Sequence, residues 1–156
     1  MITIEIPGRD EALQISHIVL DYNGTIAVDG QLVPGLDAPI TELSKLVDIH
    51  VLTADTYGTV RAQCAHLPVN VHTFPRAGAG LCKEEIVKGL TGGVACYGNG
   101  FNDIPMFDIA DLAIAVLLEE GMCAKLLPHA DIFVRSIHDG LDLFLKPDHL
   151  RAALRN

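Results

Sequence analysis

The stretch LDYNGT, residues 20–25, directly follows a segment that holds the apolar, β-branched residues Ile15, Ile18 and Val19. Such a segment is typical of a buried strand, and Asp21, Asn23 and Gly24 are residue types that favour a turn at its end. In an open parallel sheet, ligands bind beyond the carboxyl ends of the strands. The stretch therefore predicts a strand that brings a carboxylate, an amide and a tight turn to one edge of a sheet.

Along the rest of the chain, short apolar runs alternate with segments of helical periodicity. This rhythm is typical of parallel strands joined by crossover helices, and it predicts a single domain over residues 1–156 with a three-layer α/β/α sandwich fold. The first strand is expected at an antiparallel edge. We expect strands at residues 2–6, 15–20, 48–53, 69–74, 93–97, 112–116 and 131–134, and helices at residues 38–47, 57–67, 81–90, 102–110, 120–127 and 138–154.

A hairpin signal follows the first polar cluster. In TIAVDGQLV, residues 25–33, the pair Asp29-Gly30 lies between alternating apolar and polar residues. Asp-Gly in this setting is typical of a two-residue hairpin turn. The sequence therefore predicts a small flap immediately after the strand that ends near Asp21.

The composition limits the partners and the compartment. The formal net charge is −9, with 11 Lys and Arg residues against 20 Asp and Glu residues. Binding to nucleic acid or to an anionic membrane requires clustered basic residues, so neither partner is expected. The cysteines are spread singly, the N-terminal residues lack a signal-peptide pattern, and no apolar run approaches the ~20 residues that span a bilayer. We expect a soluble, cytoplasmic protein with reduced thiols.

Chemically useful residues lie at four strand ends or helix starts. Taken singly, Asp21 could cap a turn, Thr53 could cap a helix, Lys83 could be a solvated helix residue, and GNGFND, residues 98–103, could be a loop. Together they supply an acid, a hydroxyl, an ammonium and a second acid in a glycine-rich loop. These are the groups needed to bind a phosphoryl group with a divalent cation and to attack it with a carboxylate.

The order and spacing of these residues resemble the haloacid dehalogenase (HAD) superfamily of phosphohydrolases. That family has a first motif D-x-D-G-T, a second that ends a strand in Thr or Ser, a third that is Lys, and a fourth G-D-G-x-N-D. Here the four read DYNGT (21–25), VLTAD (51–55), Lys83 and GNGFND. LTADTYGTV, GNGFNDIPMF, ADLAIAV and HADIFV are also similar to segments of the phosphorylation domain of P-type ATPases and their soluble relatives. The resemblance implies a Rossmann-like parallel sheet.

The resemblance implies a role for each matching residue. Asp21 would be the nucleophile that forms an aspartyl-phosphate, and Lys83 would neutralise charge on the nucleophile and the phosphate. The remaining implied roles are phosphoryl binding by Thr53 and the backbone amides near Gly24 and Ala54, contact with phosphate or substrate by Asn102, a loop anchor at Thr25, and Mg²⁺ ligation by Asp21, the main-chain carbonyl of Asn23, Asn99 and Asp103.

Two positions depart from the family pattern by replacing a carboxylate with an amide. Asn23 stands where most HAD phosphatases have the acid–base Asp, a group worth about 10²–10⁴ in rate. Asn99 stands where the family usually has a direct Mg²⁺ ligand, and loss of the carboxylate charge at this position should weaken Mg²⁺ binding. Two hypotheses follow: a slow or specialised phosphatase or phosphotransferase, and a catalytically inactive HAD-fold module that binds a phosphorylated ligand or a protein partner.

Residues 26–52 and 56–82 leave no room for a cap domain or for the nucleotide-binding domain of a P-type ATPase. Capless members of the superfamily act on large substrates or borrow a neighbouring subunit as a lid. The resemblance therefore implies a phosphorylated small molecule or phosphoprotein as substrate, and a possible homo-oligomer that supplies the lid.

Two further expectations concern an alternative fold and the histidines. A response-regulator receiver domain also places Asp, Thr and Lys at strand ends, but no acidic pair precedes Asp21. The seven histidines are expected to pack without clustering, with His17 in a strand and His50 and His72 near strand ends.

Overall fold

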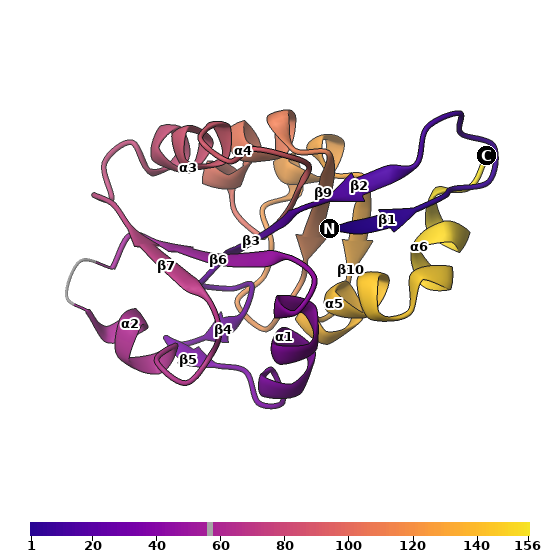
Figure 1. The fold of residues 1–156 in the computed structure, drawn as a ribbon. Coiled ribbons are helices and arrows are strands. Elements are labelled where there is room, and N and C mark those ends of the chain that lie inside the picture. The colour runs from indigo at the N-terminus through magenta and orange to yellow at the C-terminus, as the bar shows by residue number, and fades with distance from the viewer. Residues whose placement is uncertain (56–57) are drawn as a thin grey trace.

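The fold is built on a six-stranded sheet, seen in a computed structural model that describes residues 1–55 and 58–156 (Figure 1). All of its neighbouring strands are parallel, in the order β10-β9-β8-β3-β6-β7. The order reverses between β3 and β8, which is where a doubly wound sheet opens a crevice for ligands. The six strands are β3 (His17–Asp21), β6 (Asp48–Thr53), β7 (Asn70–Thr73), β8 (Val94–Gly98), β9 (Leu112–Val116) and β10 (Ile132–Val134).

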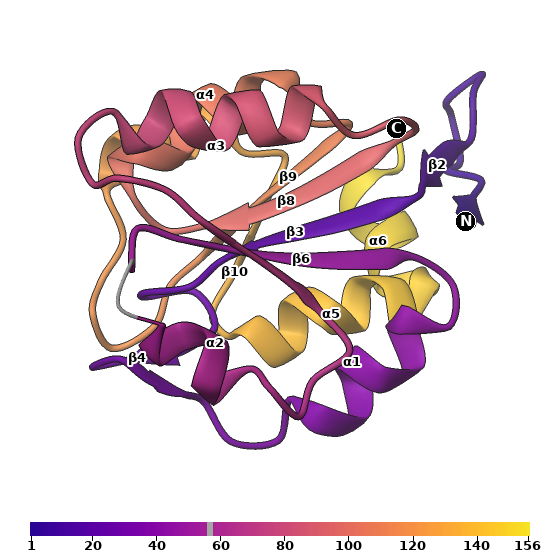
Figure 2. The same ribbon diagram turned by 60° about the vertical axis from the view of Figure 1, so that its left-hand side comes forward.

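Helices cover both faces of the sheet, so the predicted three-layer α/β/α sandwich is confirmed (Figure 2). One face carries α3 (Ala79–Lys88), α4 (Ile104–Ile109) and the short 3₁₀ helices η1 (Phe101–Asp103) and η2 (Ala124–His129). The other face carries α1 (Asp37–Ser44), α2 (Thr59–Gln63), α5 (Ile137–Leu145) and α6 (Pro147–Leu154). Within the described ranges, every helix falls short of the length and apolar character that crossing a bilayer demands.

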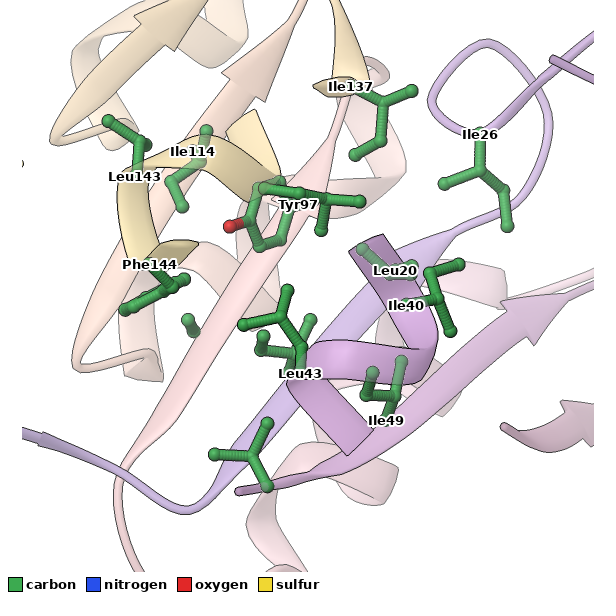
Figure 3. Close-up of a cluster of buried hydrophobic side chains, with 14 of the residues drawn as sticks. Leu20, Ile26, Ile40, Leu43, Ile49, Tyr97, Ile114, Ile137, Leu143 and Phe144 are labelled. Carbon is green, nitrogen blue, oxygen red and sulfur yellow. The ribbon is translucent and has the colours of Figure 1, made fainter. Parts of the chain in front are cut away.

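The strands bury apolar side chains on both faces. In β3, Leu20 belongs to the core under α1 and α5, whereas the neighbouring Val19 belongs to the core under α3 and α4. Figure 3 shows the first core, where Ile40 and Leu43 of α1 approach the sheet. Successive residues of a strand point to opposite faces, which explains this division. Because both faces are packed, polar groups at the strand ends are held on a rigid frame.

The predicted flap is present as a hairpin of β4 (Ala27–Val28) and β5 (Gln31–Leu32). Its turn residues Asp29 and Gly30 both have positive φ, at 51° and 79°, as a type I′ turn requires. The hydroxyl of Tyr22 donates to the carbonyl of Gly30 at 2.9 Å, which ties the flap to the end of β3. In the described residues between β3 and α3, the chain forms only this flap, α1, β6, α2 and β7, so no cap domain is present there.

Several predicted boundaries need correction. The first strand, β1 (Ile2–Ile4), pairs antiparallel with β2 (Leu13–Ile15) in a separate two-stranded sheet, so it is not an edge of the main sheet. The helix predicted at 138–154 is two helices, because Pro147 lacks an N–H and cannot continue α5. The helix predicted at 120–127 is the 3₁₀ helix η2. The predicted start of α2 at residue 57 lies outside the described residues.

The prediction that the histidines do not cluster is wrong. His17, His50 and His72 form a row across β3, β6 and β7, with 3.1 Å between Nδ1 of His17 and Nε2 of His50 and 3.0 Å between Nδ1 of His50 and Nε2 of His72. Nε2 of His17 donates to the carbonyl of Thr91 at 3.0 Å. A carbonyl only accepts, so in the neutral row each ring donates through Nε2 and accepts at Nδ1.

Candidate active site

A hollow of about 210 Å³ opens at the carboxyl ends of the central strands. Of the ten predicted site residues, all but Gly24, Thr25 and Asp103 line it. The lining residues come from the ends of β3, β6, β7 and β8, from η1 and from α3; they are Asp21, Asn23, Thr53, Ala54, Phe74, Ala79, Lys83, Asn99, Gly100 and Asn102.

Lys83 lies at the centre of the polar contacts. Its Nζ is 2.8 Å from Oδ1 of Asp21, 2.7 Å from Oδ1 of Asp103 and 3.0 Å from Oδ1 of Asn102. An ammonium has three N–H donors, so these three oxygens use all of them. The Lys83 side chain is only 4% exposed, and α3 brings it over the end of β3. The ammonium is therefore held in one position, facing the carboxylate of Asp21.

The electrostatics of this cluster are unbalanced, with two carboxylates and one ammonium. Burial and the negative charge of Asp103 raise the pKa of Asp21 to about 7, although Lys83 and Thr25 oppose the shift. Burial lowers the pKa of Lys83, but Asp21 and Asp103 together raise it above its ordinary value. Lys83 therefore keeps its charge at neutral pH, and any added cation or loss of Asp103 would favour ionised Asp21.

Asp103 supports the site from behind the hollow. Its Oδ1 is bonded to Lys83, and its Oδ2 accepts from the backbone N–H groups of Asn99 and Gly100, both at 3.0 Å. A Cβ at Gly98 would collide with this carboxylate, so only glycine fits there. Asp103 is fully buried and does not line the hollow. Asp103 therefore fixes Lys83 and the loop at residues 98–103, and the metal ligation expected of it stays a prediction.

Thr25 joins the two loops of the site. Its buried hydroxyl lies 3.3 Å from Oδ2 of Asp21 and 3.4 Å from Oδ1 of Asn99. Gly24 adopts a positive φ of 78°, and a Cβ on it would overlap the amide of Asn99. Its N–H donates to the carbonyl of Ala27 at 2.8 Å, which accounts for its position behind the wall of the hollow. Gly24 therefore allows the loop after β3 and the loop that carries Asn99 to approach each other closely.

The end of β6 supplies a hydroxyl to the opposite wall. Thr53 is 2% exposed, and its Oγ1 accepts from the backbone N–H of Asp55 at 3.1 Å. Because that contact uses the oxygen as acceptor, the hydroxyl hydrogen can still be donated towards the hollow. The carboxylate of Asp55 accepts from the N–H of Val60 at 2.9 Å and so ties this loop to α2.

The oxygen atoms around Asp21 form a donor set that fits Mg²⁺, although weakly. Oδ2 of Asp21 and Oδ1 of Asn99 both lie close to the Thr25 hydroxyl, and Asn23 lines the same wall. Mg²⁺ is commonly held by one or two carboxylates, with water and substrate oxygens completing its shell. Over residues 1–55 and 58–156, no group of three or more His, Cys, Asp or Glu residues could hold a metal ion, so this set depends on amide and main-chain oxygens.

Three lining residues were not predicted. Phe74 directly follows β7, and this place at a strand end is the signal that could have predicted it. Ala79 lies four positions before Lys83 on α3 and therefore on the same face of the helix. Gly100 lies within the predicted glycine-rich loop, but nothing in its residue type marks it as part of the wall.

Solved structures with the same fold are assigned to hydrolases and transporters. A protein assigned to the HAD family of hydrolases from Streptomyces avermitilis is 21% identical, with a TM-score of 0.67 over 86% of this chain and 93% of that chain. The 3-deoxy-D-manno-octulosonate 8-phosphate phosphatase of Moraxella catarrhalis, in complex with a magnesium ion, a phosphate ion and a KDO molecule, is 14% identical, with a TM-score of 0.65 over 90% and 94%. A zinc-transporting PIB-type ATPase is 24% identical, with a TM-score of 0.63 over 78% of this chain and 20% of that chain. The molecule thus has the HAD-type α/β fold.

Sequence comparison is more specific. No protein-family model matches the chain. The chain is 40% identical over 63 residues to uncharacterized protein MJ0073 of Methanocaldococcus jannaschii, which covers 40% of this chain and 68% of that protein. It is 46% identical over 39 residues to uncharacterized protein MJ0072 of the same organism, which covers 25% of this chain and 89% of that protein. The chain belongs to the family of the MJ0073 protein.

Proposed function

We propose that the protein is a Mg²⁺-dependent phosphohydrolase or phosphotransferase that acts through an aspartyl-phosphate on Asp21. The observation that carries this proposal is the single ammonium of Lys83, held 2.8 Å from Asp21 by Asp103 and Asn102 inside a hollow at the sheet's switch point. A carboxylate beside a fixed cation, with a hydroxyl on the facing wall, suits nucleophilic attack on a phosphoryl group.

In this reaction a carboxylate oxygen of Asp21 forms a bond to phosphorus, and the bond from phosphorus to the leaving oxygen breaks with its electron pair. Lys83 and the Thr53 hydroxyl stabilise negative charge on the phosphoryl oxygens. Asn102, whose amide oxygen is occupied by Lys83, has its N–H₂ group left to contact the substrate. When bound, Mg²⁺ would neutralise phosphoryl charge, held by Asp21, the carbonyl of Asn23 and Asn99.

The amide at position 23 predicts which substrates react. Asn23 lines the hollow but has no proton to give, so the leaving oxygen must depart as an anion or take its proton from water. Substrates with good leaving groups, such as acyl phosphates and aryl phosphates, should therefore react faster than alkyl phosphates. For the same reason no side chain at position 23 activates water, and the phosphoenzyme should be long-lived.

The test is incubation with Mg²⁺ and acetyl phosphate or an aryl phosphate, followed by intact-mass measurement and an assay of released phosphate. The expected result is a phosphoryl adduct or slow turnover that is abolished by Asp21→Asn. The opposite result would be that no adduct and no turnover are detected while calorimetry shows binding of inorganic phosphate. The protein would then be a catalytically inactive module that binds a phosphorylated ligand.

Changing Asn23 to Asp tests the missing acid–base group directly. If that group limits hydrolysis, Asn23→Asp should raise the rate of phosphate release by about tenfold to a hundredfold, the lower part of the range for general acid–base catalysis. The adduct on Asp21 should then decay faster in a single-turnover experiment. An unchanged decay rate would mean that metal binding or water access limits the second step.

The hollow has no cap among the described residues, so closure by a second copy of the chain is part of the proposal. A phosphorylated small molecule or a phosphoprotein would be the substrate in either case. Light scattering coupled to size exclusion should show an oligomer whose dissociation lowers activity. A monomer at all concentrations would leave a large substrate, such as a phosphoprotein, as the group that closes the site.

A further inference from the structure

Asn99 makes contacts that the carboxylate of the family motif could not make. Its Nδ2 donates to the carbonyl of Gly121 at 3.2 Å, and its Oδ1 lies on the side of Thr25 and Asp21. The orientation of the amide is fixed, because only its nitrogen can donate to a carbonyl. The backbone carbonyl of Asn99 also accepts from the N–H of Cys123 at 2.8 Å. Asn99 is therefore bonded twice to the loop at residues 117–123, which we call the bridging loop.

The bridging loop is in turn bonded to the flap. The carboxylate of Glu120 accepts from the backbone N–H of Asp29, at the tip of the flap, at 3.0 Å. Asp29 is the non-glycine residue with positive φ in the described chain, so its backbone conformation needs support from such contacts. A continuous set of hydrogen bonds thus runs from the wall of the hollow through the bridging loop to the flap tip.

An aspartate at position 99 would break this set. One of its carboxylate oxygens would lie opposite the carbonyl oxygen of Gly121, where two acceptors repel each other and no hydrogen bond forms. Gly24 packs directly against the amide nitrogen, so the side chain has no space to turn away. The carbonyl of Gly121 and the close approach of Gly24 therefore suit an amide at position 99 better than a carboxylate.

We propose that Asn99 is a positioning residue, whose amide aims its own oxygen at Asp21 and fastens the bridging loop, and through Glu120 the flap tip, to the site. The effect on catalysis rests on the proposed function, whereas the fastening itself does not. Asn99 is then more than a metal ligand without charge. The substitution Asn99→Asp should weaken the attachment of the bridging loop and the flap tip to the site.

Hydrogen exchange of the metal-free protein tests the fastening without any assay of activity. Asn99→Asp should make the amides of Cys123 and Asp29 exchange about tenfold faster, because one hydrogen bond is replaced by a repulsive contact. The matched control is Asn102→Asp, which adds the same charge nearby but keeps an acceptor for Lys83. Equal exchange in wild type and Asn99→Asp at both amides would overturn the proposal.

A second pair of variants covers the case in which Asn99→Asp does not fold. Glu120→Ala removes the acceptor for the Asp29 amide, and Glu120→Gln retains one. The Asp29 amide should exchange about tenfold faster in Glu120→Ala and near the wild-type rate in Glu120→Gln. Identical exchange in the two variants would show that Glu120 does not hold the flap, which contradicts the proposal.

Kinetics then separate positioning from metal binding. With an aryl phosphate, Asn99→Asp should lower kcat at saturating Mg²⁺ even if it lowers the Mg²⁺ concentration needed for half-activation. A rise in kcat with unchanged exchange would mean that Asn99 is only a weakened ligand. Absence of both turnover and a phosphoryl adduct in the wild type would contradict the proposed function, and the exchange results would still decide whether Asn99 fastens the bridging loop.

Discussion

Strand β3 carries a different polar cluster at each end, with His17 at its start and Asp21 at its end. At the carboxyl end, Asp21 and Asp103 share the ammonium of Lys83 through contacts of 2.8 and 2.7 Å. At the other end, His17 begins a row of three rings linked through their nitrogens. One cluster is held together by ion pairs and the other by contacts between ring nitrogens, although both are largely buried.

Burial shifts both clusters towards their neutral forms, but with opposite consequences for pH. It raises the pKa of Asp21 to about 7 and, aided by His72 and His17, lowers the pKa of His50 to about 4. Between the ordinary pKa and the folded pKa, folded Asp21 binds more protons than the unfolded chain, so its contribution to stability falls as pH rises from about 4 to about 7. Folded His50 binds fewer protons than the same residue in the unfolded chain. Its contribution to the free energy of unfolding therefore falls as the pH drops from 6.5 to about 4.

The largest expected effect removes Lys83, the cation that balances the carboxylates of Asp21 and Asp103. Lys83→Met should lower the free energy of unfolding by about 3–5 kcal/mol at pH 8, because Asp21 and Asp103 would remain buried without a cation. Lys88→Met, in the same helix but with a half-exposed side chain, is the control. Urea denaturation of the two variants measures the difference; similar losses would mean that Lys83 does not hold the cluster together.

The histidine row should produce the next largest effect, in acid. The wild type should lose about 3 kcal/mol of stability from His50 as pH falls from 6.5 to about 4, the value of its pKa shift in free energy. His50→Gln should remove most of this loss. Chemical denaturation at a series of pH values gives the difference between the two proteins, with the exposed His66→Gln as control. Parallel curves for wild type and His50→Gln would show that the row does not govern acid stability.

A smaller effect of opposite sign is expected at Asp21, the proposed nucleophile. Asp21→Asn should raise the free energy of unfolding by about 1–2 kcal/mol at pH 8 in the presence of EDTA, because it removes an excess buried charge and leaves an amide oxygen that can still accept from Lys83. The gain should shrink at pH 5, where folded Asp21 is already protonated. The exposed Asp148→Asn serves as control, and a loss of stability at pH 8 would contradict the unbalanced charge assigned to the cluster.

The sequence predicted one of these clusters and missed the other. Asp21 and Thr53 are the last residues of parallel strands, and Asn99 directly follows another. Because parallel strands end at one edge of the sheet, residue type and strand order suffice to bring the three together. The direction of the Asp103 side chain could not be predicted in this way, since it depends on the turn that aims two backbone amides at it.

The histidine row depends on register between strands far apart in sequence. In the pairing of β3 with β6, Val19 lies opposite His50, and in the pairing of β6 with β7, Leu52 lies opposite His72. This diagonal offset brings the rings within reach, and no local pattern of residues specifies it. The same lack of long-range information explains why β1 was predicted at the edge of the main sheet.

The N–H donors of the histidine row all point the same way, so the two ends of the row differ. The carbonyl of Thr91 accepts at one end, and Nδ1 of His72 is the outer acceptor at the other end, on the edge strand β7. A first proton can therefore enter at His72 without breaking a link, whereas a second must set two N–H groups against each other. Burial and the positive charge of Arg61 on α2 lower the pKa of His72, so this outer ring takes up a proton only at a lower pH than a free histidine would.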